Sequence, residues 1–455
     1  MENKEIPICI IGAGLTGLSI AYYLKKRGKK VILLEKKKQA GGVIRTLTED
    51  GFTFETGPNT GVLGTTELVE LFRDLGDKVK VITANPHSES RWIWKNKRWN
   101  PLPSGPISAI TTPLFSFKDK LNVLLEPFRK PGQNPDETVA ELVVRRLGKS
   151  FLDYAIDPFI GGIYSGDPGR LVTRYALPKL YLLEQEYGSF IRGAIKKRKE
   201  VKSELEKQVT KAVFSIEGGL GELIRVLVEE IGEENILTEA GNLRIEKEKE
   251  SFRIQFDHPS RGTEEIQAMK VVTTVDGKSL HSMLPFIETN DLKQIELTEY
   301  AKVIQVVLGY KQWDGIPLKA FGGLVPSVEK RDILGILFPS SLFKNRAPEE
   351  GALLSVFMGG INRPWFYDRS KGDLERTALK EVEQMLQVKS NPDLIKVYKY
   401  EKAIPQYELQ SGVRLATIQK IETNFPGLTL AGNIRDGIGM ADRVKQAKQL
   451  GTTLD

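Results

Sequence analysis

The alternation of apolar and polar positions is most regular near the N-terminus. An apolar run from Ile8 to Ile11 is followed by a glycine-rich stretch, and then by a segment in which Leu18, Tyr22 and Leu24 recur on one side of a helix. A second apolar run extends from Val31 to Leu34. This pattern predicts a strand, a tight turn, an amphipathic helix and a second strand, which together form one βαβ unit.

The turn of this unit carries three glycines in G-x-G-x-x-G spacing, at Gly12, Gly14 and Gly17. The first permits a sharp turn, the second lets backbone amides approach a diphosphate, and the third lets the helix pack closely on the strand. Glu35 lies 18 residues after Gly17, near the ~20 expected for a carboxylate that accepts from ribose hydroxyls. The predicted dinucleotide contacts in this unit are Gly12, Gly14, Leu15, Thr16, Gly17, Glu35 and Lys36.

A second group of glycines follows the unit. Gly41 and Gly42 precede Arg45 and Thr46 in a G-G-x-x-R-[ST] segment. A simple nicotinamide-binding unit does not require such a segment. The segment resembles the one that follows the first βαβ unit in flavoproteins with two dinucleotide-binding domains, where the backbone and the arginine approach FAD. With the predicted turn that follows the next strand, the resemblance adds to the cofactor site Gly41, Gly42, Arg45, Thr46, Gly57, Pro58 and Asn59.

The middle of the chain changes character. Residues 91–101 read as a hairpin that places Arg91 beside tryptophans, and residues 105–204 are mainly helical in pattern. One of these helices has an apolar stripe that begins at Val139, and Asp136 is its predicted N-cap. Further strands and helices follow to residue 400. In this stretch Asn242 is also assigned to the cofactor.

The C-terminal segment resembles the last cofactor-binding element of the same flavoproteins. An apolar strand pattern from Leu428 to Ala431 runs into Gly432 and Asn433, and Gly439 precedes a helix that begins at Met440. In the flavoproteins this helix N-terminus points at the flavin pyrimidine, where its dipole stabilises the anionic reduced ring. Asn433 stands where an acid is usual and can still hydrogen-bond the ribityl chain. The predicted contacts here are Gly432, Asn433, Gly439 and Met440.

Composition narrows the function classes. The chain has 455 residues and a hydrophobic content of 40%, which allow a large core. Its net charge of +7 does not require a nucleic-acid partner. Its single cysteine, Cys9, excludes a disulfide within the chain and suits a reducing cytoplasm. The three histidines show no metal-ligand spacing, so we expect no metal. So few cysteines and histidines also favour a flavin that is bound non-covalently.

Several segments narrow the resemblance to one family. PDETVAELVVRRLG, DPFIGGIYSGDPGRL, EGGLGEL, FGGLVPS and LGILFPSSLFKNRAPEEGALLSVFMGG occur in the order found in the protoporphyrinogen and coproporphyrinogen III oxidases of haem synthesis, within the flavin amine oxidase and phytoene desaturase superfamily. The resemblance covers nearly the whole chain. It implies an α/β plus α+β fold with a Rossmann-like, p-hydroxybenzoate-hydroxylase-like FAD domain (residues 1–84, 205–285 and 400–455), a mixed-sheet substrate domain (85–104 and 286–399) and a helical, membrane-associating domain (105–204).

The resemblance also implies a reaction. A porphyrinogen would lose six electrons to become a porphyrin, with hydride passing to flavin N5 and with oxygen or a quinone reoxidising the flavin. The substrate-binding residues would be Arg91, which pairs with a propionate, Gly166, which lies against the ring, and Phe321, which covers one face. No side chain in these segments stands out as a general base. The sequence leaves open which porphyrinogen is used.

Two alternatives remain open at this point. One is another FAD enzyme of the superfamily, such as an amine oxidase or a carotenoid desaturase, and the other is a flavin-binding protein without catalytic activity. The resemblance further implies a cytoplasmic protein that associates peripherally with the inner face of the cell membrane, and a homodimer is compatible with it. Nucleic acid is not an expected partner.

Overall fold

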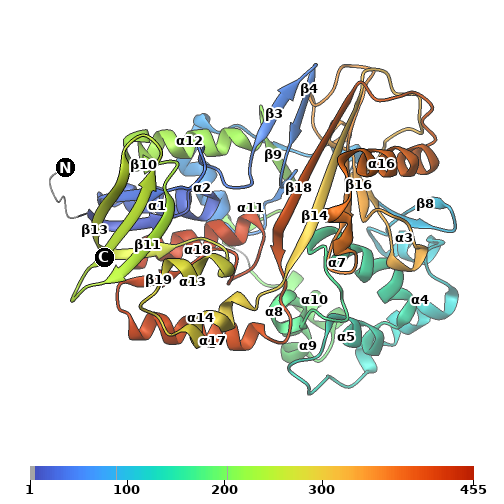
Figure 1. Cartoon of the computed structure of the whole chain (residues 1–455). Coiled ribbons are helices and arrows are strands. Elements are labelled where there is room, and N and C mark those ends of the chain that lie inside the picture. Colours follow the sequence, from blue (N-terminus) through green and yellow to red (C-terminus); the bar gives the residue numbers. More distant parts are fainter. Residues whose placement is uncertain (1–5, 89, 202, 455) are drawn as a thin grey trace.

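The computed structural model describes residues 6–88, 90–201 and 203–454, and it contains two large sheets and a helical region (Figure 1). In the first sheet, β1 pairs in parallel with β2 and β13, while β13, β12 and β11 form an antiparallel meander. Its strands are β1 (Ile6–Ile11), β2 (Val31–Leu34), β10 (Ile236–Leu237), β11 (Gly241–Lys247), β12 (Phe252–His258), β13 (Gly262–Thr273) and β19 (Leu428–Leu430). The central parallel strands read as continuous apolar runs because both of their faces are buried.

Helices cover both faces of this sheet. α1 (Leu15–Lys26), α2 (Thr66–Leu75), α12 (Gly221–Ile231) and α18 (Met440–Thr453) share one apolar core with Ile10 and Leu33. On the other face, Ile11 and Leu34 pack with the meander and with α13 (Leu280–Met283), α14 (Thr289–Glu296) and α17 (Ser411–Asn424). Burial raises the pKa of the Cys9 thiol on this second face to about 12, so Cys9 behaves as a small apolar side chain.

α1 and α18 lie side by side and run in the same direction. Arg27, at the C-terminal end of α1, donates through Nη1 to the carbonyl oxygens of Gly451 (2.9 Å) and Leu454 (3.1 Å), at the C-terminal end of α18. A side chain at Gly451 would meet Cβ of Tyr23 at 2.5 Å, which shows how closely the two helices pack. Because their C-terminal ends meet, their N-termini lie at the same end of the pair.

The second sheet stands beside the first. Its strands, in order across the sheet, are β18 (Leu394–Pro405), β14 (Tyr300–Tyr310), β17 (Ala352–Gly359), β16 (Gly335–Leu337), β15 (Gly322–Leu324), β7 (Arg91–Lys95) and β8 (Arg98–Pro101). One face packs on α16 (Lys371–Leu386) through Ile304, Val306 and Val356. The opposite face receives the hairpin of β3 (Thr46–Glu49) and β4 (Phe52–Glu55), whose phenylalanines pack on Val307.

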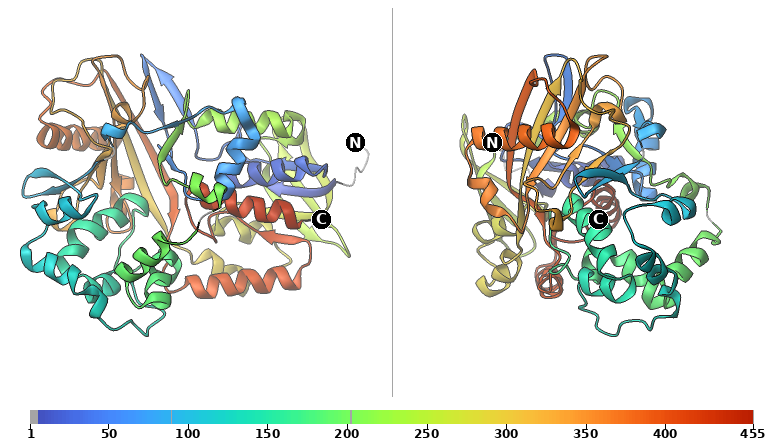
Figure 2. Two further views of the ribbon diagram at one scale, coloured as in Figure 1. Left: turned by 180° about the vertical axis from the view of Figure 1, so that it is seen from behind. Right: turned by 90° about the vertical axis from the view of Figure 1, so that its right-hand side faces the viewer.

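The helical region lies beneath the second sheet, away from the β3–β4 hairpin (Figure 1, Figure 2). Its main helices are α3 (Pro106–Thr111), α4 (Phe117–Leu124), α5 (Val139–Arg146), α7 (Asp157–Ile163), α9 (Pro178–Tyr187) and α10 (Phe190–Arg198). The predicted cap of α5 was wrong: Thr138 accepts from the amide of Glu141 in a reciprocal capping box, while Asp136 receives a hydrogen bond from Arg174.

The first sheet draws its strands from three distant stretches of the chain, residues 6–34, 236–273 and 428–430, and the second sheet from residues 91–101 and 300–405. The expected division at residue 400 falls inside β18, which pairs with β14 as far as Pro405. Both ends of the described chain lie on the side of the first sheet (Figure 1).

A buried ion pair fixes the helical region. Glu126 and Arg146 are both fully buried and in contact, and the Glu126 carboxylate also accepts from the Ser189 hydroxyl (2.5 Å) and the Phe190 amide (2.9 Å). Burial alone would raise the pKa of Glu126, but these bonds outweigh it and hold the pKa below its usual value. The pair therefore stabilises the folded state above the ordinary carboxyl pKa, and this contribution is lost as the pH falls through the lowered value.

We predict that Glu126→Gln destabilises the protein by about 1.5–3 kcal/mol, because the buried Arg146 would keep only the Glu184 carboxylate (3.3 Å), which Arg145 also engages (2.9 Å). The same change at Glu204, whose ion pair with Lys207 is exposed, should cost no more than about 1 kcal/mol. Urea denaturation at pH 7 measures both values. Equal midpoints for the two variants would contradict the structural role of the buried pair.

Candidate active site

The glycine turn is tightly constrained. Gly12 has a φ of +100°, and a Cβ there would lie 2.6 Å from the Thr274 hydroxyl, which donates to the carbonyl oxygens of Ile11 (3.0 Å) and Gly12 (3.1 Å). A Cβ on Gly17 would overlap the Gly12 carbonyl oxygen. α1 begins at Leu15, and its first intrahelical bond runs from the Leu18 amide to Gly14. The preceding amides, including that of Thr16, are therefore available to an anion.

Glu35 lies at the end of β2, beside this turn. Its buried carboxylate accepts from the amide of Ala13 (2.9 Å) and from the amide of Lys37 (2.9 Å). A carboxylate has about four acceptor positions, so two remain for hydroxyl donors. The structure thus brings Glu35 to the glycine turn, whereas the side chain of Lys36 is exposed to solvent.

The glycine doublet packs directly on the turn. The Gly41 amide donates to the Ala13 carbonyl oxygen (2.7 Å), and Gly14 and Gly41 form an isolated parallel bridge. A Cβ on Gly14 would meet only the Cα of Gly42, at 3.9 Å. The protein itself therefore leaves space above Gly14, which is what close approach of a ligand requires.

The side chain of Thr46 is engaged within the protein, and its predicted contact with the cofactor stays a prediction. Its hydroxyl donates to Oε2 of Glu55 (2.7 Å) and accepts from the amide of Gly221 (2.9 Å), at the start of α12. Oε1 of Glu55 accepts from the Leu220 amide (2.9 Å) and from Arg346 (3.2 Å). Burial raises the pKa of Glu55, and the bonds from Thr46, Arg346 and Leu220 oppose this shift. The side chain of Arg45 is exposed.

The sequence analysis did not single out Glu55 and Arg346. Both are 4% exposed, and Arg346 also donates to the hydroxyl of Ser215 (2.7 Å). Each is a charged residue in an otherwise apolar or turn-forming context, which is a usable signal. However, 291 residues separate them, so the pairing itself had no local signature.

The turn from Gly57 to Asn59 is fastened to the second sheet. A Cβ on Gly57 would overlap the Val43 carbonyl oxygen, and Asn59 accepts from the hydroxyl of Ser355 (2.9 Å) on β17. Gln305 on β14 donates to the backbone oxygen of Glu55 (2.8 Å), just before the turn. Pro58 lies within it. The predicted flavin-side turn therefore contacts two strands of the same sheet that carries Arg91.

The predicted C-terminal cofactor element, which begins at Gly432, and the glycine turn both contact Thr274. Gly432 has a φ of +92°, and a Cβ there would lie 3.0 Å from the Thr274 carbonyl oxygen, while the Thr274 hydroxyl contacts Gly12. The backbone oxygen of Asn433 accepts from the Tyr407 hydroxyl (3.2 Å). Gly439 is the N-cap of α18, which begins at Met440. The parallel packing of α1 and α18 thus directs two helix N-termini to the same place.

Asn242 is the predicted cofactor residue whose side chain the structure does not bring to this group. It is exposed at the start of β11, and its amide donates to Asp257 on β12 (2.9 Å). The neighbouring residue that reaches the site is Ala240, whose backbone amide donates to the Glu35 carbonyl oxygen (2.9 Å).

Arg91 and Phe321 come together on the second sheet. Cζ of Arg91 lies 5.1 Å from the centroid of the Phe321 ring, and Phe321 and Leu337 pack against the same buried cluster, which includes Leu342. Residues opposite one another in a sheet share a face, and the register runs from Arg91 through Gly322 and Leu337 to Ser355. Arg91 therefore shares a face with the serine that binds the Asn59 turn.

The same register adds a residue that the sequence analysis missed. Phe357 lies two positions after Ser355 on β17 and is opposite Gln305 on β14, so it belongs to this face. Phe357 and Leu337 are only partly buried, which makes them available as apolar walls. Their signal in the sequence was the alternation along each strand, but only strand order shows that the two strands are neighbours.

Gly166 lies where the helical region meets the ends of β17 and β18. A Cβ on Gly166 would meet Oε1 of Gln406 at 2.5 Å, and Ser165 accepts from the Ile361 amide (2.8 Å). Oε1 of Gln406 is buried without a hydrogen-bond partner in the described part of the chain. No contact in that part joins Gly166 to Arg91 or Phe321, so the grouping of these three residues stays a prediction.

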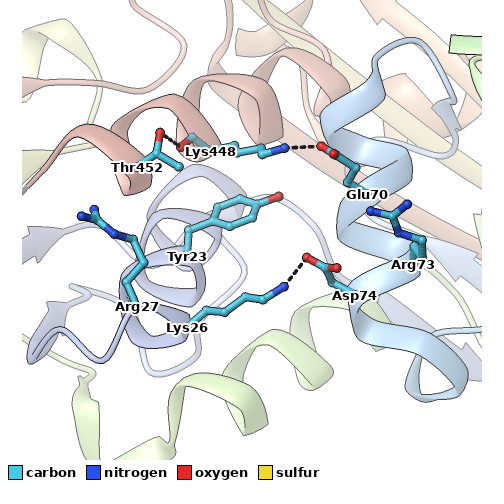
Figure 3. Close-up of a pocket in the computed structure, with 8 residues that line it drawn as sticks. All are labelled: Tyr23, Lys26, Arg27, Glu70, Arg73, Asp74, Lys448 and Thr452. Atoms are coloured by element: carbon cyan, nitrogen blue, oxygen red, sulfur yellow. Dashed lines mark hydrogen bonds and ion pairs between the residues drawn. The ribbon is translucent and has the colours of Figure 1, made fainter. Parts of the chain in front are cut away.

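A surface pocket of about 460 Å³ lies elsewhere, among α1, α2 and α18 (Figure 3). Lys26 pairs with Asp74 and Lys448 with Glu70 around the ring of Tyr23, and Arg27 and Arg73 also line the pocket. It adjoins the C-terminal half of α1, whereas the glycine turn is at the N-terminus. This pocket is therefore separate from the predicted cofactor site.

Comparisons with known proteins agree with this geometry. Residues 15–443 match the family of flavin containing amine oxidoreductases. The chain belongs to this family. It is 31% identical to the mitochondrial protoporphyrinogen oxidase of Nicotiana tabacum over 95% of this chain and 91% of that one. It is 24% identical to the coproporphyrinogen III oxidase of Bacillus subtilis (strain 168) over 98% of this chain and 97% of that one.

Solved structures show the same fold. A protein from Exiguobacterium sp. 255-15, provisionally assigned as a protoporphyrinogen oxidase, superposes with a TM-score of 0.81 at 23% identity and covers 99% of this chain and 98% of its own. Cyclohexylamine oxidase from Brevibacterium oxydans IH-35A gives a TM-score of 0.69 at 16% identity, with 99% of both chains covered. The predicted flavoprotein fold class and the resemblance to the porphyrinogen oxidases are confirmed, and membership of the family implies a flavin cofactor.

We predict that Gly14→Val abolishes flavin retention without unfolding the protein. The valine side chain would occupy the space above the turn, while its Cβ meets the protein only at an ordinary contact distance. The control is Gly105→Val at the start of α3, where a Cβ meets nothing within 4 Å. The flavin absorbance of each purified variant and its melting temperature test the prediction. A folded Gly14→Val protein that stays yellow would show that the turn does not hold the cofactor.

Proposed function

We propose that the protein oxidises a porphyrinogen to a porphyrin with a non-covalently bound FAD. The observation that carries the proposal is the position of Arg91 over Phe321, on the sheet face that also binds the Asn59 turn. This arrangement supports an anionic, flat substrate held next to a dinucleotide. The names of the relatives support the same substrate class.

In this proposal, residues 1–84, 205–285 and 400–455 form the FAD-binding part. Glu35 accepts from the ribose hydroxyls, and the amides at the start of α1 donate to the diphosphate. Gly41 and Gly42 keep the backbone close to it. The N-terminus of α18, at Gly439, favours negative charge on the reduced ring. When bound, FAD supplies the acceptor for hydride.

The second sheet, from residues 85–104 and 286–399, would hold the substrate. Arg91 pairs with a propionate, since a guanidinium makes strong charge-assisted bonds to a carboxylate. Phe321, Leu337 and Phe357 supply apolar and aromatic surface for the macrocycle. Gly166, from the helical region, lies against the ring. These residues position a meso carbon and exclude water, and we assign no general base.

The overall change must balance. Conversion of one porphyrinogen to its porphyrin removes six hydrogen atoms as three hydrides and three protons, and each hydride is followed by reoxidation with oxygen or a quinone.

A substrate panel tests the proposal. Aerobic incubation with coproporphyrinogen III or protoporphyrinogen IX should give porphyrin fluorescence at an enzyme-dependent rate. Turnover of a primary amine or of phytoene, with neither porphyrinogen oxidised, would instead favour another activity of the family.

We predict that Arg91→Ala raises the Michaelis constant for the porphyrinogen by roughly tenfold to a hundredfold, because a charge-assisted pair in a partly desolvated site contributes about 1.5–3 kcal/mol. The control is Arg98→Ala, which removes the same charge at the turn end of the β7–β8 hairpin. Steady-state kinetics on flavin-saturated variants measure both. A normal Michaelis constant for Arg91→Ala would remove Arg91 from the site, and loss of flavin would make its role structural.

We also propose that the helical region, residues 105–204, contacts a membrane surface. None of the helices in the described ranges is both long and apolar enough to cross a bilayer. However, the α3–α4 surface exposes large apolar side chains beside the exposed lysines Lys118 and Lys130, a combination that favours shallow insertion into anionic lipid. These apolar residues are Ile107, Ile110, Phe117, Leu121, Leu124, Leu125 and Phe128.

We predict that the double change Phe117→Ser and Phe128→Ser lowers binding to vesicles of anionic phospholipid by at least about tenfold. The two rings are 83% and 79% exposed, and burial of each would contribute about 1.5–3 kcal/mol. Leu297→Ser, at a residue 54% exposed at the end of α14, is the control. Vesicle sedimentation measures the binding. Equal sedimentation of the wild type and the double variant would contradict the membrane surface.

A further inference from the structure

Arg443 is a buried cation in the second turn of α18. Arg443 is 7% exposed. Its guanidinium donates to the carbonyl oxygen of Gly432 and to that of Arg435 (2.8 Å). Its Nε has no hydrogen-bond partner within the part of the chain that the structure describes. The guanidinium therefore lies directly behind the Gly432–Asn433 turn, with one donor unused.

The charge of Arg443 is not balanced by an ion pair. Across the described residues, no carboxylate lies within 4.0 Å of its nitrogens, although the neighbouring Arg435 pairs with Glu422 at 3.0 Å. The two nearby acids hydrogen-bond to other groups, Asp436 to Gln446 (2.7 Å) and Asp442 to the amide of Gly439 (3.0 Å), and they attract Arg443 only at longer range. Burying a charge without an opposite charge in contact is unfavourable, so such a residue indicates a further negative partner.

The position of Arg443 identifies the class of that partner. The Gly432 turn and the glycine turn both contact Thr274, and the N-termini of the parallel helices α1 and α18 lie at this same end. Helix N-termini favour phosphate groups. An anion at this point would therefore meet two helix N-termini and one buried guanidinium.

We propose that Arg443 is a positioning residue that balances the diphosphate charge of the bound dinucleotide through the Gly432–Asn433 turn; the proposal rests on the flavin function proposed above. In the flavin-free protein the buried charge of Arg443 is only partly balanced, by Asp436 and Asp442 at longer range, and it lowers stability. In the flavin-bound protein its charge is balanced. Its contribution therefore has opposite signs in the two states, which a purely structural residue would not show.

The test compares Arg443→Gln with Lys445→Gln, which removes the same charge from an exposed position two residues further along α18. Arg443→Gln should release FAD roughly 10- to 100-fold faster on dilution, followed by flavin fluorescence, and Lys445→Gln should stay within about twofold of wild type. Arg443→Lys, which keeps the charge, should lie closer to wild type than Arg443→Gln.

Melting temperatures decide between the two roles. Removal of flavin should lower the melting temperature of wild type more than that of Arg443→Gln, and flavin-free Arg443→Gln should melt no lower than the flavin-free wild type. Wild-type release kinetics in Arg443→Gln would overturn the proposal. So would a variant that fails to fold or melts lower without flavin, because the fold would then need the residue. A wild-type protein that binds no flavin would instead refute the proposed function itself.

Discussion

A buried carboxylate must be surrounded by donors, and at Glu55 this requirement draws distant parts of the chain together. Thr46, the amide of Leu220 at the N-cap of α12 and Arg346 all donate to its side chain, and Gln305 donates to its backbone. Removal of any of these donors would leave a buried polar group without a hydrogen-bond partner and would destabilise the folded state by about 1–3 kcal/mol. The hairpin that follows the glycine doublet, helix α12 and the second sheet are therefore held in one arrangement, and the Gly57–Asn59 turn follows directly from it.

The second constraint is steric, and it acts at the predicted cofactor site, where several glycines pack closely on neighbouring backbone. Gly12, Gly17, Gly41 and Gly432 each lie where a side chain would collide with protein atoms, whereas Gly14 faces open space. The first group brings the glycine turn, the doublet and the last element together, and Gly14 leaves room for the ligand. In the proposed function, dinucleotide binding would result from close backbone packing on three sides, together with two helices that begin at the same end.

Local signals in the sequence were enough to predict the βαβ unit, the glycine doublet and the C-terminal element. Their chemistry depends on residues within about 30 positions of one another, and strand and helix periodicity adds to it. Long-range pairs were not predictable in the same way. The bond between Thr46 and Glu55 is one example, because its surroundings are completed by α12 and by Arg346, both far away in the sequence.

Two further differences have specific causes. The cap of α5 was assigned to Asp136, although the T-x-x-E pattern of Thr138 and Glu141 was present in the sequence. Asn242 was assigned without knowledge of strand order, and its amide pairs with β12 instead. Arg91 and Phe321 came from family resemblance, and their contact on the second sheet supports that assignment.

In the proposed function a porphyrinogen gives up hydride to the bound flavin. Anaerobic titration of the flavin-loaded protein measures this transfer, with the flavin absorbance followed as coproporphyrinogen III or protoporphyrinogen IX is added in portions. We expect complete bleaching at about one third of an equivalent of substrate, because each molecule carries three hydrides, with formation of the fluorescent porphyrin. A flavin that stays oxidised in excess of both porphyrinogens would contradict it.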